Sequence, residues 1–128
     1  FSISAQKLDK ENLGVTAAVV LLMAEYITVT TKALRWNSGK QPGLYRRIGL
    51  SAGLNVIDLA DPSADRAAIN WVDQLIAESG VQLGLSHHGV RQEHIVPLAQ
   101  LAMKDSCHLT NPIRMEEEDF RGLYQTLL

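Results

Sequence analysis

The sequence has a single cysteine among its 128 residues, so no disulfide can form within the chain and an oxidising compartment is not indicated. Its lysines and arginines form no long run, and a net charge of −2 gives no electrostatic reason to expect nucleic acid as a partner. The longest apolar stretch, over residues 15–24, is too short to cross a bilayer. We therefore expect a cytoplasmic protein that binds neither nucleic acid nor membranes.

The composition is otherwise that of a globular chain. Apolar residues make up 46% and charged residues 20%, which argues against disorder. A chain of 128 residues can form one domain that buries roughly two thirds of its unfolded surface, and we expect residues 1–128 to form that domain. Phe1 is not an initiator methionine and no signal-peptide pattern follows it, so we expect the chain to begin inside a longer protein or to be processed.

Apolar residues at spacings of three and four predict a first long helix over residues 13–34. The stripe consists of Leu13, Ala17, Val20, Leu21, Ala24, Ile27, Thr31 and Leu34. The β-branched residues between 26 and 31 favour a strand instead. We prefer a buried helix because no turn separates the two halves, and we expect it to end at Asn37-Ser38-Gly39.

Two further helices are predicted before residue 80. A short one begins with Pro42 in its first turn, carries a stripe of Leu44, Tyr45, Ile48 and Ala52, and ends at Gly53. After a loop over residues 55–60, Asp61 is expected to cap a long helix with Pro62 at its first position and Gly80 just past its end. Its expected apolar face is Ala64, Ala67, Ala68, Trp71, Val72, Leu75 and Ile76, with Asp65, Arg66, Asn70, Asp73 and Gln74 outside it.

The last third of the chain predicts two more helical segments after a loop over residues 81–90. One starts near Arg91, and Pro97 should begin a fresh turn within it. The residues expected to face inward from it are Ile95, Leu98, Leu101 and Ala102. The final helix begins near Glu116, where acidic residues suit a helix start, and buries Phe120, Leu123 and Leu127. We predict an all-α fold, an orthogonal or bundle-like set of about five helices without a sheet.

The segment over residues 104–114 holds the only cysteine and ends in a turn at Asn111-Pro112. Cys107 is either a small buried hydrophobe or a residue that lines a pocket beside His108. A nucleophilic pair of Cys107 and His108 is disfavoured, because neighbours in sequence rarely face each other and no orienting third group can be named. The four histidines have no spacing typical of metal ligands, so we expect loop or surface histidines. Trp36 and Trp71 are expected to anchor the core.

Several motifs together resemble the C-terminal helical domain of iron-containing (group III) alcohol dehydrogenases. They are Ala33-Leu34-Arg35-Trp36-Asn37, Tyr45-Arg46-Arg47-Ile48, Gly80-Val81, His88-Gly89-Val90, and the ending Asp105-Ser106-Cys107-His108-Leu109-Thr110-Asn111-Pro112 followed by Glu117-Glu118-Asp119-Phe120. The family has a D-x-C-x-x-x-N-P-R loop before a T-x-E-D-hydrophobic helix. The resemblance covers about residues 33–128, and residues 1–32 diverge.

The resemblance implies a two-domain oxidoreductase that interconverts alcohols and aldehydes or ketones with NAD(P) and Fe²⁺ or Zn²⁺. It implies an N-terminal nucleotide-binding domain as partner, because no strand followed by a glycine-rich turn occurs here. Where the family has its last histidine ligand, this sequence has Leu22-Met23 or, with an insertion, Leu13-Gly14. The other ligands would lie before Phe1. We therefore expect no catalytic, cofactor-binding or metal residue in this chain, and no activity from it alone.

In the resembled family the cysteine loop approaches the substrate cleft. This implies Cys107, His108 and Asn111 as substrate-cleft candidates. Two alternatives stay open: a stand-alone helical interaction module, which could be a homodimer, and a small-ligand-binding domain that uses the Cys107 loop.

Overall fold

The computed structural model describes residues 29–81 and 83–128, and every regular element in these ranges is helical. A helix over residues 29–40 comes first. It is followed by α2 (Arg46–Ser51), α3 (Asp61–Glu78), the 3₁₀ helices η2 (Leu85–His88) and η3 (Gln92–His94), α4 (Ile95–Lys104), the 3₁₀ helix η4 (Ser106–Thr110) and α5 (Glu117–Gln125). The all-α prediction is confirmed. Of the helix predicted over residues 13–34, residues 13–28 lie outside the described residues, and the remainder, from residue 29, is helical rather than extended.

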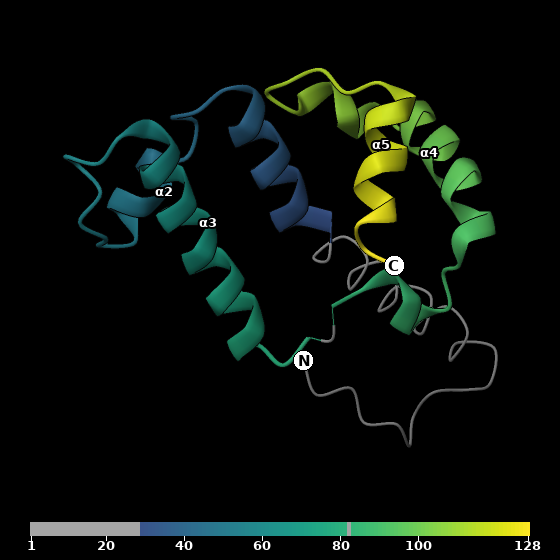
Figure 1. The fold of residues 1–128 in the computed structure, drawn as a ribbon, viewed down its shortest axis with the longest axis horizontal. Coiled ribbons are helices and arrows are strands. Elements are labelled where there is room, and N and C mark those ends of the chain that lie inside the picture. Colours follow the sequence, from purple (N-terminus) through teal and green to yellow (C-terminus); the bar gives the residue numbers. More distant parts are fainter. Residues whose placement is uncertain (1–28, 82) are drawn as a thin grey trace.

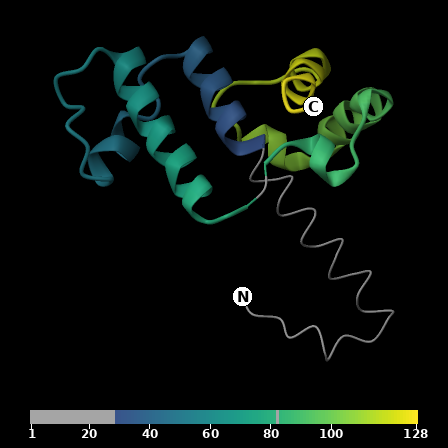
Figure 2. The same ribbon diagram turned by 60° about the horizontal axis from the view of Figure 1, so that its bottom comes forward.

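The helix over residues 29–40 lies between two helical pairs, α2 with α3 on one side and α4 with α5 on the other (Figures 1 and 2). Val29, Ala33 and Trp36 repeat at spacings of four and three, and they pack against the cluster formed by α4, α5 and Met115. Leu34 lies on a different face and packs against the cluster of α2 and α3. This helix therefore contributes side chains to both halves of the core, as an amphipathic pattern with two apolar faces allows.

The first cluster joins α3 to the chain that precedes α2. Its buried members are Tyr45, Ala68 and Ile69, with Leu34 and Leu44 packed against them. Helix α2 is followed by Ala52 as its cap and by Gly53, whose φ of +77° is a conformation that glycine adopts at little cost. The amide of Leu54 donates to the carbonyl oxygen of Gly49, which closes this end in the manner of a Schellman motif. Gly80, with φ +74°, follows the end of α3 as predicted.

The second cluster joins α4 to α5. Its buried members are Ala99, Met115, Phe120 and Leu123. The stripe predicted for the last helix is confirmed, since Phe120, Leu123 and Leu127 are all buried. Pro97 is the third residue of α4, so its missing amide hydrogen is one that the first turn leaves unpaired. The loop predicted over residues 81–90 contains the 3₁₀ helix η2, and the Leu85 amide ties it to the Leu127 carbonyl at 2.9 Å.

Four expected boundaries differ from the structure. The helix that we expected to end at Asn37-Ser38-Gly39 includes these residues and continues to residue 40, because the Gln41 amide still donates to the Asn37 carbonyl. Pro42 lies in the turns before α2 rather than in its first helical turn. Asp61 is the first residue of α3 and not its cap, which is Ala60; its carboxylate instead pairs with Arg46 at 2.7 Å. Pro62 is accordingly the second residue of that helix rather than the first.

Some residues that we predicted to be buried are exposed, and some that we predicted to be exposed are buried. Asp65 was placed on the polar face of its helix but is completely buried. Leu75 and Leu101 were placed on apolar faces but are 52% and 60% exposed, while Ile69 and Ala99 take the buried positions. Ile48 is also exposed, and Gly49 is the buried residue of α2. The helical period was right in each case, but the centre of the apolar face lies about one residue away from where we put it.

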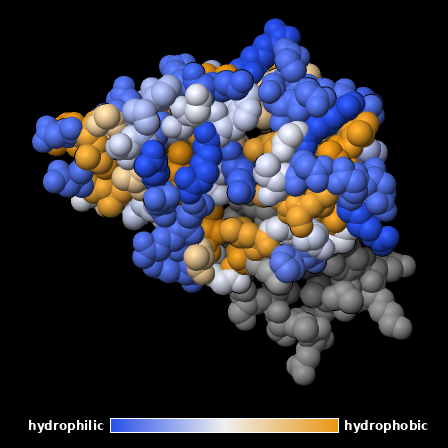
Figure 3. Space-filling view, in the orientation of Figure 1, coloured by the Kyte–Doolittle hydropathy of each residue, from blue (hydrophilic) through white to orange (hydrophobic). Residues whose placement is uncertain are grey.

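The surface is largely polar, with apolar side chains gathered at several places, including the end formed by α2 and the loop after it (Figure 3). The exposed apolar residues of that end are Ile48, Leu50, Ile57 and Leu59. Arg46 holds the loop in place by donating to the carbonyl oxygens of Val56, Ile57 and Leu59. No helix within residues 29–81 and 83–128 has the length and apolar character needed to span a membrane.

Candidate functional site

The cysteine turn, residues 105–111, connects α4 to the extended chain before α5 and contains η4. It forms because Asp105 caps it: the carboxylate Oδ1 accepts a hydrogen bond from the Cys107 amide at 2.9 Å. The Thr110 hydroxyl donates to the Cys107 carbonyl oxygen at 2.7 Å, which closes the turn from its other end. These bonds are local, so they fix the shape of the turn but not its place on the protein.

Cys107 lies on the surface. The expectation that it is a buried small hydrophobe is therefore wrong. The hydrogen bond with the Asp105 carboxylate raises the pKa of the Cys107 thiol, and the negative charge of that carboxylate raises it further. The pKa of Asp105 is lowered, first by the hydrogen bond from the Cys107 amide and then by the hydrogen bond with the Cys107 side chain. A raised thiol pKa leaves less thiolate at neutral pH, so the local electrostatics do not activate Cys107 as a nucleophile.

The His108 side chain points back toward the protein and is half-buried. Its ring meets the edge of Phe120 in a T-shaped contact, with the ring centroids 6.2 Å apart and an interplanar angle of 85°. Its Nδ1 contacts the backbone carbonyl of Asp105. The imidazole is thus directed at the start of α5 and at its own turn. This orientation agrees with our expectation that Cys107 and His108 do not form a nucleophilic pair.

Asn111 ends the cysteine turn and joins it to the helix over residues 29–40. The Asn37 Nδ2 donates to the Asn111 Oδ1 at 2.8 Å, and the Asn111 Nδ2 donates back to the Asn37 Oδ1 at 2.7 Å. The remaining protons of the two amides are also used: Asn37 donates to the Tyr45 hydroxyl at 2.9 Å, and Asn111 to the Ile113 carbonyl oxygen at 2.6 Å. Asn37 is only 2% exposed, whereas Asn111 is half-buried, so the pair is shielded from water on the Asn37 side.

A buried carboxylate lies next to this pair. Asp65 accepts three hydrogen bonds, from the Ser38 hydroxyl at 2.7 Å and from the amides of Gly43 and Tyr45 at 2.8 Å each. We call Asn37, Tyr45, Asp65 and Asn111 the polar cluster. Burial raises the pKa of the Tyr45 hydroxyl; the hydrogen bond from Asn37 opposes that rise and the Asp65 charge adds to it. The cluster joins the first half of the protein to the cysteine turn through satisfied hydrogen bonds.

The described residues do not fit the iron or zinc ion that the resemblance implies. Among residues 29–81 and 83–128, no three histidine, cysteine, aspartate or glutamate side chains lie close enough together to hold a metal ion. His87 and His94 are exposed and belong to different 3₁₀ helices, as expected of surface histidines. The His94 Nδ1 accepts a hydrogen bond from the Arg91 amide and so serves its own short helix. We derive no chemical step through a metal from this part of the chain.

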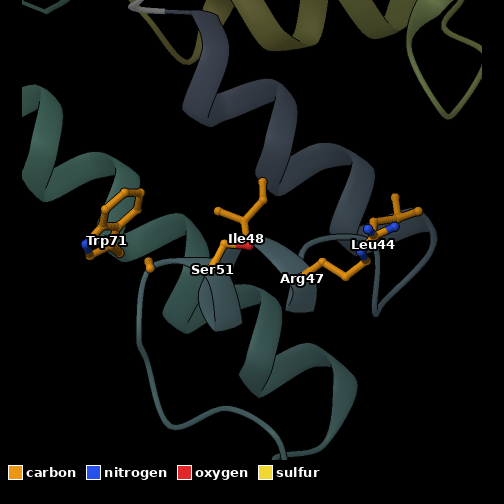
Figure 4. A pocket seen from close by; sticks show the side chains of 6 residues that line it. Leu44, Arg47, Ile48, Ser51 and Trp71 are labelled. Atoms are coloured by element: carbon orange, nitrogen blue, oxygen red, sulfur yellow. The ribbon is translucent and has the colours of Figure 1, made fainter.

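An open groove of about 790 Å³ lies between α2 and α3, and none of the three candidate residues lines it (Figure 4). Its lining residues are Leu44, Arg47, Ile48, Ser51, Ala52 and Trp71. Trp71 is half-buried there. Trp36 packs against the cluster of α4 and α5. The Lys40 Nζ lies over the ring of Trp36, 5.4 Å from its centroid. Trp36 is therefore the better example of the predicted core anchor.

Sequence reasoning missed Asn37 and Asp65 as members of the polar cluster. Asn37 was read as a helix end because Asn-Ser-Gly is typical of one. The signal that could have found Asp65 is its spacing, since it lies three and four residues before Ala68 and Ile69 on the buried face of α3. A polar residue at such a position indicates a buried partner, although the sequence does not say which. The fold and the site together define an all-helical domain with a surface turn anchored by buried amides.

Comparisons with known proteins agree with this description. Residues 14–128 match the group described as "Fe-containing alcohol dehydrogenase family, C-terminal". Lactaldehyde reductase of Escherichia coli K12 is 34% identical over 93 residues, which are 73% of this chain and 24% of that protein. EutG of the same strain, described as a probable alcohol dehydrogenase, is 42% identical over 62 residues, which are 48% of this chain and 16% of that protein. The crystal structure of a 1,3-propanediol oxidoreductase has a TM-score of 0.73 at 22% identity, covering 80% of this chain and 27% of that chain.

The chain belongs to the iron-containing alcohol dehydrogenase family and represents its C-terminal domain. The family predicted from the sequence motifs is thereby confirmed, as is the all-helical fold expected of that domain. The match to 1,3-propanediol oxidoreductase supports the fold alone, because a sequence identity of 22% is too low to support more. The chain spans about a quarter of the length of the curated lactaldehyde reductase that it matches.

Proposed function

We propose that this chain is the helical part of an NAD(P)-linked oxidoreductase that interconverts alcohols and aldehydes or ketones. The family match over residues 14–128 carries the proposal. The names of the relatives support it, because lactaldehyde reductase and 1,3-propanediol oxidoreductase both refer to small hydroxylated three-carbon compounds. A small aldehyde or diol is therefore the substrate class that we expect.

The chain acts, in this proposal, only together with a nucleotide-binding domain. Relatives about three times as long, as the matched share of lactaldehyde reductase implies, leave room for that domain. The described residues offer no ligand set for iron or zinc. Chain 1–128 alone should consequently bind neither NAD(P) nor a stoichiometric metal ion, and it should not reduce aldehydes.

The role of this chain in the assembled enzyme is to line the substrate cleft with the cysteine turn. Cys107 is exposed and is not chemically activated, so we assign it to substrate contact rather than to covalent chemistry. His108 and Asn111 are held from behind by Phe120 and Asn37. A rigid, partly polar turn of this kind can orient a small hydroxylated substrate without forming a bond to it.

The test is a chimera of E. coli lactaldehyde reductase in which residues 33–128 of this chain, which lie after the position of the family's last histidine ligand, replace their counterpart. We expect the chimera to fold and to retain NAD(P)H-linked aldehyde reduction, whereas chain 1–128 alone has none. A folded chimera without activity would contradict the proposal. So would a chimera that does not fold, because a true C-terminal domain of the family should pack in that framework. Aldehyde reduction by chain 1–128 alone would contradict it too.

The cleft assignment has its own measurement in the same chimera. Cys107→Phe should raise the KM for the aldehyde about tenfold, which corresponds to roughly 1.4 kcal/mol of binding free energy. The matched control is Ser86→Phe, an exposed position of the 3₁₀ helix η2, which should leave the KM unchanged. Equal KM values in both variants would contradict the assignment of the cysteine turn to the substrate cleft.

A second candidate function is a stand-alone helical interaction module. The exposed apolar residues Leu50, Ile57 and Leu59 favour it, because they lie on one end of the molecule, beside the open groove. Light scattering after size-exclusion chromatography tests it. A dimer that Ile57→Asp converts to a monomer would support the module, and a monomer at all concentrations would contradict it.

A further inference from the structure

The cysteine turn has few means of keeping its place on the protein. Its capping bonds run between residues two or three positions apart, and Leu109 at its centre is 74% exposed. Apart from the contact of the half-buried His108 with Phe120, burial of apolar surface therefore contributes little to its position. The reciprocal amide pair of Asn37 and Asn111, by contrast, joins residues 74 positions apart in the sequence.

We propose that Asn37 is the positioning residue of the cysteine turn: its buried carboxamide holds Asn111, and through it Cys107 and His108, in one place relative to the helix over residues 29–40. The inference rests on the proposed function for its biological meaning, because it assigns how the proposed cleft wall is held. Its physical content concerns the turn alone and can be tested without any activity.

The hydrogen-bond inventory of the pair explains why an amide is needed at both positions. Each side chain uses both of its amide protons and accepts one hydrogen bond from its partner. An aliphatic side chain at position 37 would leave the Asn111 amide without its partner, and a carboxylate would face the Asn111 oxygen with negative charge. No ionised side chain can replace this donor-and-acceptor pattern.

The polar cluster also fixes Asn37 itself. Its Nδ2 donates to the Tyr45 hydroxyl, and the Tyr45 amide donates to Asp65, which is completely buried. Asn37 is therefore held in one orientation before it meets the turn. This rigidity is what separates a positioning residue from one that merely touches a loop.

The experiment uses the full chain with a nitroxide spin label on Cys107, which is the only cysteine and is exposed. In the wild type we expect a largely immobilised label. Asn37→Ala and Asn111→Ala should each raise the ratio of mobile to immobile label about tenfold, the change expected for loss of one buried hydrogen-bonded pair. The double variant should show no further rise, because both changes remove the same interaction. The control is Asn55→Ala, an exposed position that should leave the spectrum unchanged.

A pH profile separates positioning from general loosening. In N37D the protonated carboxyl group has one donor and one free acceptor, which is enough to restore the reciprocal exchange with Asn111 although not the bond to the Tyr45 hydroxyl. The label should therefore become immobile as the pH falls through the pKa of that carboxyl group. The wild type should show no such transition. The titratable groups nearby, Tyr45 and Asp65 in the cluster and Asp105 and His108 in the turn, are present in both chains and cancel in the comparison.

Several results would overturn the inference. They are an unchanged spectrum in N111A, additive effects in the double variant, or an N37D spectrum that follows the wild type at every pH. If N37A does not fold, as judged by circular dichroism, N111A and N37D decide the question. An inactive chimera together with the expected spectra would refute the proposed function and leave the positioning role standing; an active chimera with unchanged spectra would do the reverse.

Discussion

Replacing Asp65 by alanine is expected to lower the free energy of unfolding by about 3–5 kcal/mol, the range typical of removing one partner from a buried charged interaction. Asp65 is completely buried and accepts from the Ser38 hydroxyl and the amides of Gly43 and Tyr45. Alanine would leave these three donors without an acceptor, and each buried donor left unpaired costs about 1–3 kcal/mol. Three such donors would cost about 3–9 kcal/mol together, and we expect the lower part of that range because Ser38 can rotate its hydroxyl toward another acceptor or water.

The matched control is Asp73→Ala in the same helix. Asp73 pairs with Arg35, but their side chains are 36% and 40% exposed, so this ion pair should contribute no more than about 1 kcal/mol. The two variants remove the same chemical group from one helix and differ mainly in burial. The comparison therefore isolates the effect of the buried hydrogen bonds from that of helix propensity.

The assay is urea denaturation followed by circular dichroism, with equal m values required for the comparison. A typical domain has about 5–15 kcal/mol in total, so D65A should be close to the limit of stable folding. The free energy of unfolding of D65N should lie between those of D65A and the wild type, because its amide keeps one acceptor oxygen. A loss in D65A no larger than that in D73A would refute the view that the polar cluster organises this half of the protein.

Three further predictions concern single residues. Gly43→Ala should cost about 1–3 kcal/mol in urea denaturation, because its φ is +99° and a Cβ would meet the Asp61 carboxyl at 3.0 Å, whereas the control Gly39→Ala meets nothing within 4 Å and should not destabilise. Asp105→Asn should lower the pKa of the Cys107 thiol toward its ordinary value, so alkylation by iodoacetamide at pH 8 should become faster; an equal or slower rate would contradict the assigned cause. The raised pKa of Tyr45 means that the folded state holds this proton more tightly than the unfolded one, so its contribution to stability is complete below the ordinary tyrosine pKa and is lost as the pH rises through the folded value. Tyr45→Phe should remove that alkaline loss, and a variant that loses stability above pH 10 as the wild type does would refute it.

The sequence predicted best where local pattern and burial agree. Helix α5 was predicted together with its buried stripe. Acidic residues mark its start, and Phe120, Leu123 and Leu127 are spaced so that they lie on one face. The long helix α3 was predicted from the proline in its first turn and from Gly80, which follows its end. Family motifs then supplied the identity of the fold, which helical periodicity alone cannot give.

The failures share a physical cause, which is that the partners of buried polar groups are distant in sequence. Asp65 was assigned to the surface by polarity, yet its donors lie 20 to 27 residues earlier. Asn37 was assigned to a helix end, yet its partners lie 8 and 74 residues away. Of the two interpretations of Cys107, the small buried hydrophobe is wrong, because its turn is capped at the surface by Asp105. That Cys107, His108 and Asn111 line a substrate cleft stays a prediction.

The helix over residues 29–40 has a consequence for cooperativity. Because its two faces complete separate hydrophobic clusters, neither helical pair keeps a full core without it. A substitution that unfolds the end of this helix should therefore destabilise both α3 and α5. The hydrogen exchange of backbone amides in both helices should become faster together. Because both helical pairs pack on this one helix, we expect them to unfold together in a single cooperative transition.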